Sequence, residues 1–231
     1  VEGWSKKARH ISYYNYMFHL AEVAVPYPMM KQMSDEVPFL YSHGVDLWQP
    51  ETIPNFESVL PGMVLTIRLA WNPKAKPAEI FDEFFPAFYG AAAKEMRQYW
   101  QLFDDGWTTV PEHAGCGFSF GRRFTPEFMK QARQTLDAAK AACKTDIERR
   151  RVAMEDDSLK QFELFMKLRR DLFAGRLEAL EADANTYMTR QLALGDQYAP
   201  QYAFSKLGWT PYTLGGLYIK CFYESAYTNA G

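Results

Sequence analysis

Aromatic and polar side chains follow two short apolar segments, and their types suit the binding of a sugar. A Trp or Tyr ring stacks on the apolar face of a pyranose, while amide and carboxylate groups bind its hydroxyls. The competing interpretation is that Trp48 belongs to the core and Glu51 is a solvated acid, and the sequence leaves both open. The candidates after the first segment are Asn15, Tyr16 and His19, and those after the second are Trp48, Gln49 and Glu51.

The sequence lacks the residue spacing that metal, disulfide-rich and phosphate-binding sites need. The four histidines show no metal-ligand spacing, and the three cysteines (Cys116, Cys143 and Cys221) include no Cys-x-x-Cys pair, although one disulfide remains possible. The glycine-rich stretch at residues 115–121 lacks the Lys-Ser/Thr of a phosphate loop. We therefore expect neither a metal nor another cofactor. The acids Glu155, Asp156 and Asp157 follow a run of arginines and indicate the solvated face of a long helix.

The elements that position the candidate residues follow a β/α pattern. Residues 10–18 and 45–48 are rich in β-branched and aromatic side chains, which predicts two short strands. A helix over residues 29–42 separates them, and a second, capped at Asn55 or Ser58, ends at Trp71. This order is typical of parallel strands, whose two faces are both buried. Tyr14 and Tyr16 would lie on one face of the first strand and Asn15 on the other.

The rest of the chain predicts helices. Asn72-Pro73 ends the helix before it, and Pro77 occupies a favourable first position of the next. Further helices are predicted at residues 77–89, 91–104, 125–143, 146–174, 176–194 and 217–227, with a loop at 106–124. The predicted fold class is mainly α. We divide the chain into residues 1–75, which carry the β/α pattern, and residues 76–231, a helical domain.

Charge and hydropathy narrow the set of partners. The chain of 231 residues has 26 Lys and Arg against 28 Asp and Glu, a formal net charge of −2. This balance gives no long-range attraction for nucleic acid or an anionic membrane. No apolar run approaches the length of a membrane span. We expect neither nucleic acid nor membrane as a partner.

Five segments together resemble one bacterial family. They are Tyr14-Asn15-Tyr16, VPYPMM at 25–30, GVDLW at 44–48, LAWNP at 69–73 and DEFFPAFYGAAA at 82–93. Across residues 1–105 they resemble the C-terminal part of a domain-of-unknown-function family found in carbohydrate-active proteins. That family is similar to barrel glycoside hydrolases of the α-glucuronidase and N-acetylhexosaminidase type. The resemblance implies that the two strands are the last two of a TIM-type β/α barrel, and that residues 58–71 are its final helix.

The resemblance also implies a site, in which Tyr16, Trp48, Gln49 and Glu51 line a carbohydrate subsite. In the related hexosaminidases a Glu follows the Trp by two positions, whereas Glu51 follows Trp48 by three. Glycoside hydrolysis needs two carboxyl groups, and in such barrels they come mainly from middle strands that this chain lacks. The expectation is therefore a C-terminal piece that is catalytically incomplete without an upstream barrel domain of the same parent chain.

Three questions stay open at this stage. Whether the parent protein is an enzyme is undecided, and its catalytic residues are unknown. The compartment is undecided, although the family is often extracytoplasmic, which would mean a periplasmic or secreted protein. The alternative function is a non-catalytic helical interaction or scaffold module, because amphipathic helices make up about two-thirds of the sequence.

Overall fold

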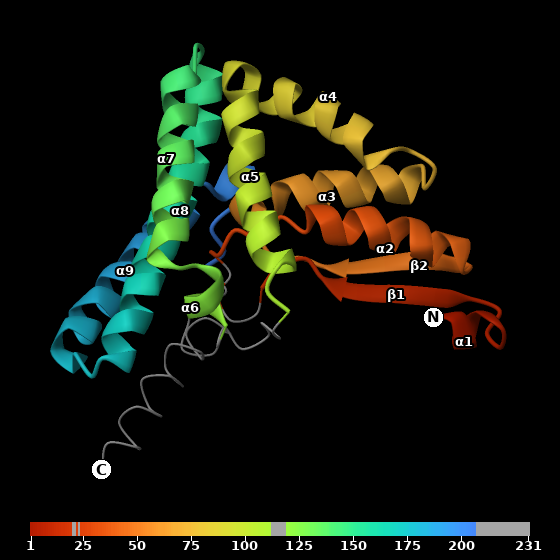
Figure 1. The fold of residues 1–231 in the computed structure, drawn as a ribbon, viewed down its shortest axis with the longest axis horizontal. Helices are drawn as coiled ribbons and strands as arrows, with labels where there is room; N and C mark the ends of the chain where they lie inside the picture. Colours follow the sequence, from red (N-terminus) through yellow and green to blue (C-terminus); the bar gives the residue numbers. More distant parts are fainter. Residues whose placement is uncertain (20–21, 23, 112–118, 207–231) are drawn as a thin grey trace.

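The computed structural model describes residues 1–19, 22, 24–111 and 119–206. After a short helix α1 (Glu2–Ser5), the chain forms β1 (Ile11–Tyr16), α2 (Met30–Ser42), β2 (Val45–Glu51) and α3 (Phe56–Trp71). The two strands pair in parallel, with α2 as the crossover helix (Figure 1). The predicted order of strand, helix, strand and helix is confirmed. β2 continues three residues beyond its predicted end at Trp48, so that Gln49 and Glu51 belong to the strand.

Within the described part of the chain, helices cover only one face of this sheet. The Tyr13 hydroxyl donates a hydrogen bond of 2.7 Å to Glu36 of α2, and Trp48 packs against the hydrophobic core. On the other face the side chains of Tyr14, Tyr16 and Leu47 are 48%, 43% and 59% exposed. The expectation that both faces are buried is therefore wrong for the described residues, because the crossover helix α2 packs on one side of the strands only.

A helical hairpin follows the sheet. It consists of α4 (Pro77–Tyr89), a single 3-10 turn η1 (Gly90–Ala92) and α5 (Ala93–Thr108). Gly90 has φ +55°, and a Cβ at this position would overlap the carboxylate of Glu148. Only glycine suits such a backbone beside so close a neighbour. The predicted break at Tyr89-Gly90 is confirmed, and α5 extends four residues past its predicted end at 104.

The remaining described elements are α6 (Phe120–Arg123), α7 (Pro126–Ala142), α8 (Asp146–Phe173), α9 (Leu177–Gln197) and η2 (Ala199–Gln201). The Thr125 side chain caps α7 as predicted, and Thr145 and Glu148 form a capping box at the start of α8. In Figure 1, α7, α8 and α9 lie side by side. Phe173, the last residue of α8, is 67% exposed. The predicted helix 217–227 lies outside the described residues.

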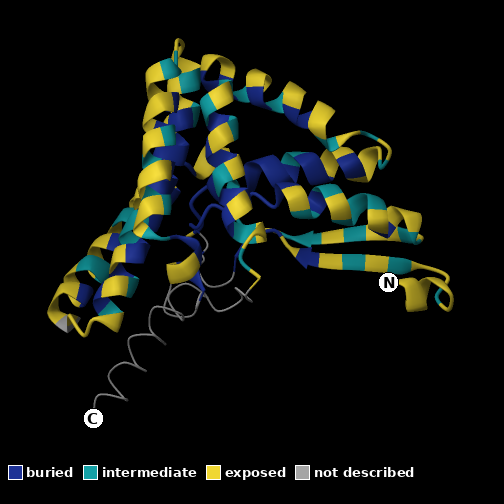
Figure 2. Cartoon of the chain, in the orientation of Figure 1, coloured by how far each residue is buried: buried dark blue, intermediate teal, exposed yellow. Residues whose placement is uncertain are grey.

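One hydrophobic core joins the strand-containing part to the helices. Figure 2 shows buried positions along α3 and on the facing sides of α5, α7 and α8. A single cluster of packed side chains extends from Met17 to Tyr187, so residue 75 does not interrupt it. The division at residue 75 stays a prediction. The apolar positions of α4 and α5 that join this cluster include Ile80, Phe81, Phe85, Tyr89, Met96, Tyr99, Trp100 and Phe103.

Candidate functional site

The uncovered side of the sheet, here called the bare face, carries three of the four predicted sugar-binding residues. Strand pairing sets Tyr14 opposite Gln49 and Tyr16 opposite Glu51. Side chains two apart in a strand point the same way, so these four lie on one surface. Tyr16 and Glu51 occupy the carboxyl ends of the parallel strands. In open and closed β/α sheets this is the end at which ligands bind.

An aromatic ladder runs along this surface. The rings of Tyr14 and Tyr16 are 5.5 Å apart and edge to face, and the rings of Tyr16 and Phe18 have the same separation. Phe18 is buried, which anchors the ladder in the core, whereas the two tyrosines are about half exposed. The bare face therefore presents two aromatic rings beside an amide and a carboxylate. These groups suit a ligand that has an apolar face and hydroxyl groups.

Trp48 lies on the opposite, helix-covered face. Its indole N–H donates a hydrogen bond of 2.7 Å to the Oδ1 oxygen of Asn15, which is itself buried. Period-two alternation turns Asn15 away from Tyr16 and Trp48 away from Gln49. The four predicted residues therefore do not form one surface: Tyr16, Gln49 and Glu51 lie together and Trp48 lies behind them. Whether any of them binds a sugar stays a prediction.

Asp46 and His19 contribute to other parts of the molecule. Asp46 Oδ2 lies 2.6 Å from His10 Nδ1, and this hydrogen bond lowers the pKa of Asp46. Five strand residues, about 16 Å, separate Asp46 from Glu51, whereas glycosidase carboxyl pairs lie about 5–9.5 Å apart. This geometry excludes the two as a catalytic pair. His19 is buried, and its ring is stacked 4.9 Å from Trp107 in an aromatic cluster.

Three glutamates are fully buried, which no pattern in the sequence predicts. Glu22 accepts hydrogen bonds from the Tyr187 hydroxyl at 2.5 Å and from the Ala24 N–H at 3.0 Å. Burial raises the pKa of Glu22 to about 7. Glu57 of α3 accepts a hydrogen bond of 3.0 Å from the Phe204 N–H, and burial raises its pKa to about 8.

Glu155 of α8 is the third of these acids. It accepts a hydrogen bond of 3.1 Å from the Tyr89 hydroxyl, which accepts one in turn from the Trp100 indole. Burial raises the pKa of Glu155 well above its usual range. The predicted solvated face is thus wrong for Glu155. Shifted pKa values often mark functional sites, but these three carboxyls are enclosed and do not face the bare face, so we assign them a structural role.

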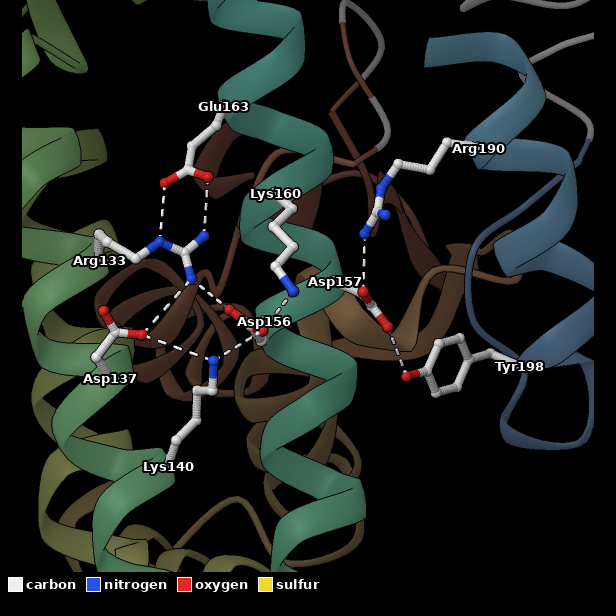
Figure 3. Close-up of polar contacts among 9 residues, drawn as sticks. All are labelled: Arg133, Asp137, Lys140, Asp156, Asp157, Lys160, Glu163, Arg190 and Tyr198. Atoms are coloured by element: carbon white, nitrogen blue, oxygen red, sulfur yellow. Dashed lines mark hydrogen bonds and ion pairs between the residues drawn. The ribbon is translucent and has the colours of Figure 1, made fainter. Parts of the chain in front are cut away.

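Asp156 and Asp157, the next two residues, point to different helices (Figure 3). Asp156 is largely buried and bonds Arg133 and Lys140 of α7 as well as Lys160 of its own helix. Burial alone would raise the pKa of Asp156, but hydrogen bonds from Lys160, Arg133 and Lys140 lower it to about 2. On the other side of α8, Asp157 binds two groups. They are the Arg190 guanidinium at 2.7 Å and the Tyr198 hydroxyl at 2.8 Å.

The apolar stripes of the C-terminal helices pack mainly inside the molecule. Buried side chains from α7, α8 and α9 contribute to the main core; they include Leu136, Ala139, Leu159, Phe162, Leu180 and Tyr187. An interaction module would need such a stripe to be exposed, and only scattered apolar side chains such as Phe173 and Leu192 are. This packing removes the main argument for the alternative function.

Within the described ranges, no three His, Cys, Asp or Glu side chains are grouped to hold a metal ion. Cys143 is a free thiol, while Cys116 and Cys221 lie outside those ranges. Among the helices that the structure describes, none has both the length and the apolar character needed to cross a membrane.

Residues 1–101 match the model of a family described as a domain of unknown function (DUF4838). The matched segment covers the sheet, α2, α3, α4 and the first half of α5, and it ends before α7. No curated protein matches the chain, and no solved structure does. Over these residues the chain is thus similar to a domain-of-unknown-function family, as the sequence analysis expects.

Proposed function

We propose that this chain is the C-terminal part of a glycosidase-like, carbohydrate-active protein, in which the bare face forms part of a sugar subsite. The observation that carries the proposal is the surface shared by Tyr14, Tyr16, Gln49 and Glu51 at the carboxyl ends of two parallel strands. Trp48 has a supporting role here, because it holds the two strands together from the other side through Asn15.

The unpaired edges of the sheet support the barrel part of the proposal. In the described residues β1 and β2 pair only with each other, so each has one unpaired edge. Parallel strands are almost always buried on both faces, and a two-stranded sheet is at best marginally stable by itself. We infer that further parallel strands, from an upstream barrel domain of the same parent chain, extend this sheet. The bare face would then point into the barrel, with Tyr16 and Glu51 at its C-terminal end, where substrate binds.

A hollow beside β2 is consistent with this extension. It has a volume of about 570 Å³ between β2, α2 and α3, and its lining includes Tyr41, Leu47 and Trp71. All three of these side chains are more than half exposed. A neighbouring strand and helix would cover them, as each β/α unit of a barrel covers the next.

Catalysis needs groups beyond those on the bare face. Glu51 is its one carboxylate among the described residues, and a glycosidase uses two. We therefore assign Tyr14, Tyr16, Gln49 and Glu51 to sugar binding. The proposed subsite leaves the acid, base and nucleophile to other strands of the parent protein.

Oligosaccharide binding by the protein at its natural full length tests the proposal. We expect calorimetric titration with a panel of neutral and acidic oligosaccharides to find a ligand, and Gln49→Ala to weaken it about tenfold. Gln134→Ala, at an exposed position of α7, is the matched control and leaves the affinity unchanged. Equal affinities for the two variants would remove the subsite from the bare face. Absence of binding across the panel would overturn the carbohydrate function itself.

A further inference from the structure

A second hollow, bounded by residues other than those of the bare face, lies among the helices. It has a volume of about 730 Å³ and is lined by the start of α3, the end of α4, the start of α8 and the segment that follows α9. Small-molecule pockets have volumes of about 300–1,000 Å³. The hollow therefore has room for a complete small ligand.

Its walls are mostly apolar. Phe56 and Leu60 come from α3, Phe88 comes from α4, and Ile147 and Met154 come from α8. Ile147, which lies beside the hollow, is 53% exposed. Such exposure is unusual for a large aliphatic side chain. Such walls favour a ligand with an apolar body, since its burial removes apolar surface of both partners from water.

Among the described residues, the charges in the lining are positive. Arg150 and Arg151 of α8 line the hollow, and no described Asp or Glu does. The Arg151 guanidinium stacks over the Phe88 ring at 4.3 Å and donates a hydrogen bond of 2.5 Å to the Phe88 carbonyl oxygen. It is thus held in place without a carboxylate partner in the described part of the chain. Arg150 is exposed, and its charge helps to lower the pKa of the Asp146 carboxyl without an ion pair or hydrogen bond to it.

The segment at the end of α9 forms a wall of the hollow that is fixed and polar at its edge. The Tyr198 hydroxyl is bonded to Asp157 (Figure 3), and its ring packs 5.0 Å from Phe204. Gln197 and Gln201 flank Tyr198 and add amide donors to the lining. The hollow thus combines an apolar interior with donors and two cations at its rim.

We propose that this hollow binds a small amphipathic carboxylate, a molecule with an apolar aliphatic or aromatic body and one anionic end. The body lies against Leu60, Phe88 and Met154, and the carboxylate meets Arg150 and Arg151. A guanidinium is the side chain best suited to bind a carboxylate through two parallel hydrogen bonds. A neutral ligand of the same shape gains the apolar contacts but leaves both charges unpaired. This site is independent of the sugar subsite.

Displacement of a fluorescent probe from the full 231-residue chain tests the proposal. The probe is 8-anilinonaphthalene-1-sulfonate, an aromatic anion, and the competitors are decanoate and its neutral analogue decanol. We expect one saturable probe site and tighter binding of decanoate than of decanol. Arg150→Gln weakens decanoate about tenfold and leaves decanol unchanged. Arg149→Gln is the matched control, because Arg149 is a neighbouring exposed arginine that pairs with Asp146 outside the hollow.

A filling variant locates the site. Ala153 lines the hollow and is exposed, so Ala153→Trp fills the space with little risk to the fold. We expect this variant to lose the probe site while its urea midpoint stays close to that of the wild type. Retention of the site in Ala153→Trp would overturn the proposal. Equal decanoate affinities for the wild type and Arg150→Gln would overturn it too.

Discussion

The indole N–H of Trp48 donates a hydrogen bond to the Asn15 side chain over 2.7 Å, from one parallel strand to the other. Asn15 is 9% exposed, so its oxygen has little access to water. The bond and the packing of the indole on the core hold Trp48 against the helices. Tyr16, next to Asn15 in the strand, consequently faces the other way.

Removal of this donor should destabilise the fold without affecting sugar binding. Trp48→Phe leaves a buried acceptor unpaired, which costs about 1–3 kcal/mol of the free energy of unfolding. We expect the affinity for any oligosaccharide to change less than about twofold. Trp71→Phe is the control, because Trp71 is 92% exposed and its replacement should change stability by less than about 0.5 kcal/mol. Urea unfolding measures both variants, and equal losses would contradict the structural role of Trp48.

The buried glutamates predict that stability falls as the pH rises. In the folded chain burial raises the pKa of Glu57 to about 8 and that of Glu22 to about 7, whereas both carboxyls have ordinary values near 4.5 when the chain is unfolded. Between the unfolded and the folded pKa values, the carboxyls of the unfolded chain lose protons that those of the folded chain still bind. The free energy of unfolding therefore declines from about pH 4.5 to about pH 8, by roughly a few kcal/mol.

Replacement of Glu57 by its neutral isostere, glutamine, isolates the contribution of this one residue to the pH dependence of stability. Glu57→Gln keeps an oxygen that can accept from the Phe204 N–H but has no charge to bury. We expect it to match the wild type at pH 5 and to exceed it in stability at pH 8.5. Urea unfolding at constant ionic strength, from pH 5 to 8.5, provides the comparison. A wild-type stability that rises over this range would contradict the assignment.

The ion network between α7 and α8 should be worth more than the ion pairs at the surface. Asp156→Asn removes the carboxylate that bonds Arg133, Lys140 and Lys160, and we expect a loss of about 2–3 kcal/mol because the site is partly buried. Asp146→Asn is the control. The Asp146 side chain is 83% exposed, and its surface pair with Arg149 contributes little to stability.

Acid should abolish this difference. The folded pKa of Asp156 is about 2, below the ordinary value of 3.8, so its contribution is present above that value and is lost as the pH falls through about 2. Thermal unfolding at pH 7 and pH 2 compares Asp156→Asn with the wild type. Similar effects of Asp156→Asn and Asp146→Asn at pH 7 would show that the network contributes no more than a surface pair.

Local signals in the sequence determined most of the helix boundaries. Pro77 begins α4, Thr125 caps α7 and Gly90 ends α4, all as predicted. Each signal acts through the backbone of a few neighbouring residues, and a single sequence carries that information. The run Glu155 to Asp157 shows the limit, because its pattern resembles a solvated face although Glu155 faces Tyr89 and Asp156 faces Arg133. Partners from distant elements decide such burial.

Only part of the candidate site could be predicted from the sequence, and the reason is related. The strand was expected to end at Trp48, which left Gln49 and Glu51 in a loop without a fixed direction. Because β2 continues to Glu51, alternation places Gln49 and Glu51 on the bare face and Trp48 behind it. Which face of the sheet is covered depends on where α2 and α3 pack. The residues of the strands alone do not determine this.

Oligosaccharide affinity in Tyr16→Ala, measured by calorimetry on the natural full-length protein, tests the bare-face subsite most directly. Phe173→Ala is the control, because Phe173 is an exposed aromatic side chain on α8, away from that face and from the hollow beside β2. The account predicts that Tyr16→Ala weakens binding at least about tenfold, or 1.4 kcal/mol, and that Phe173→Ala leaves it unchanged. Undiminished affinity in Tyr16→Ala would contradict the account.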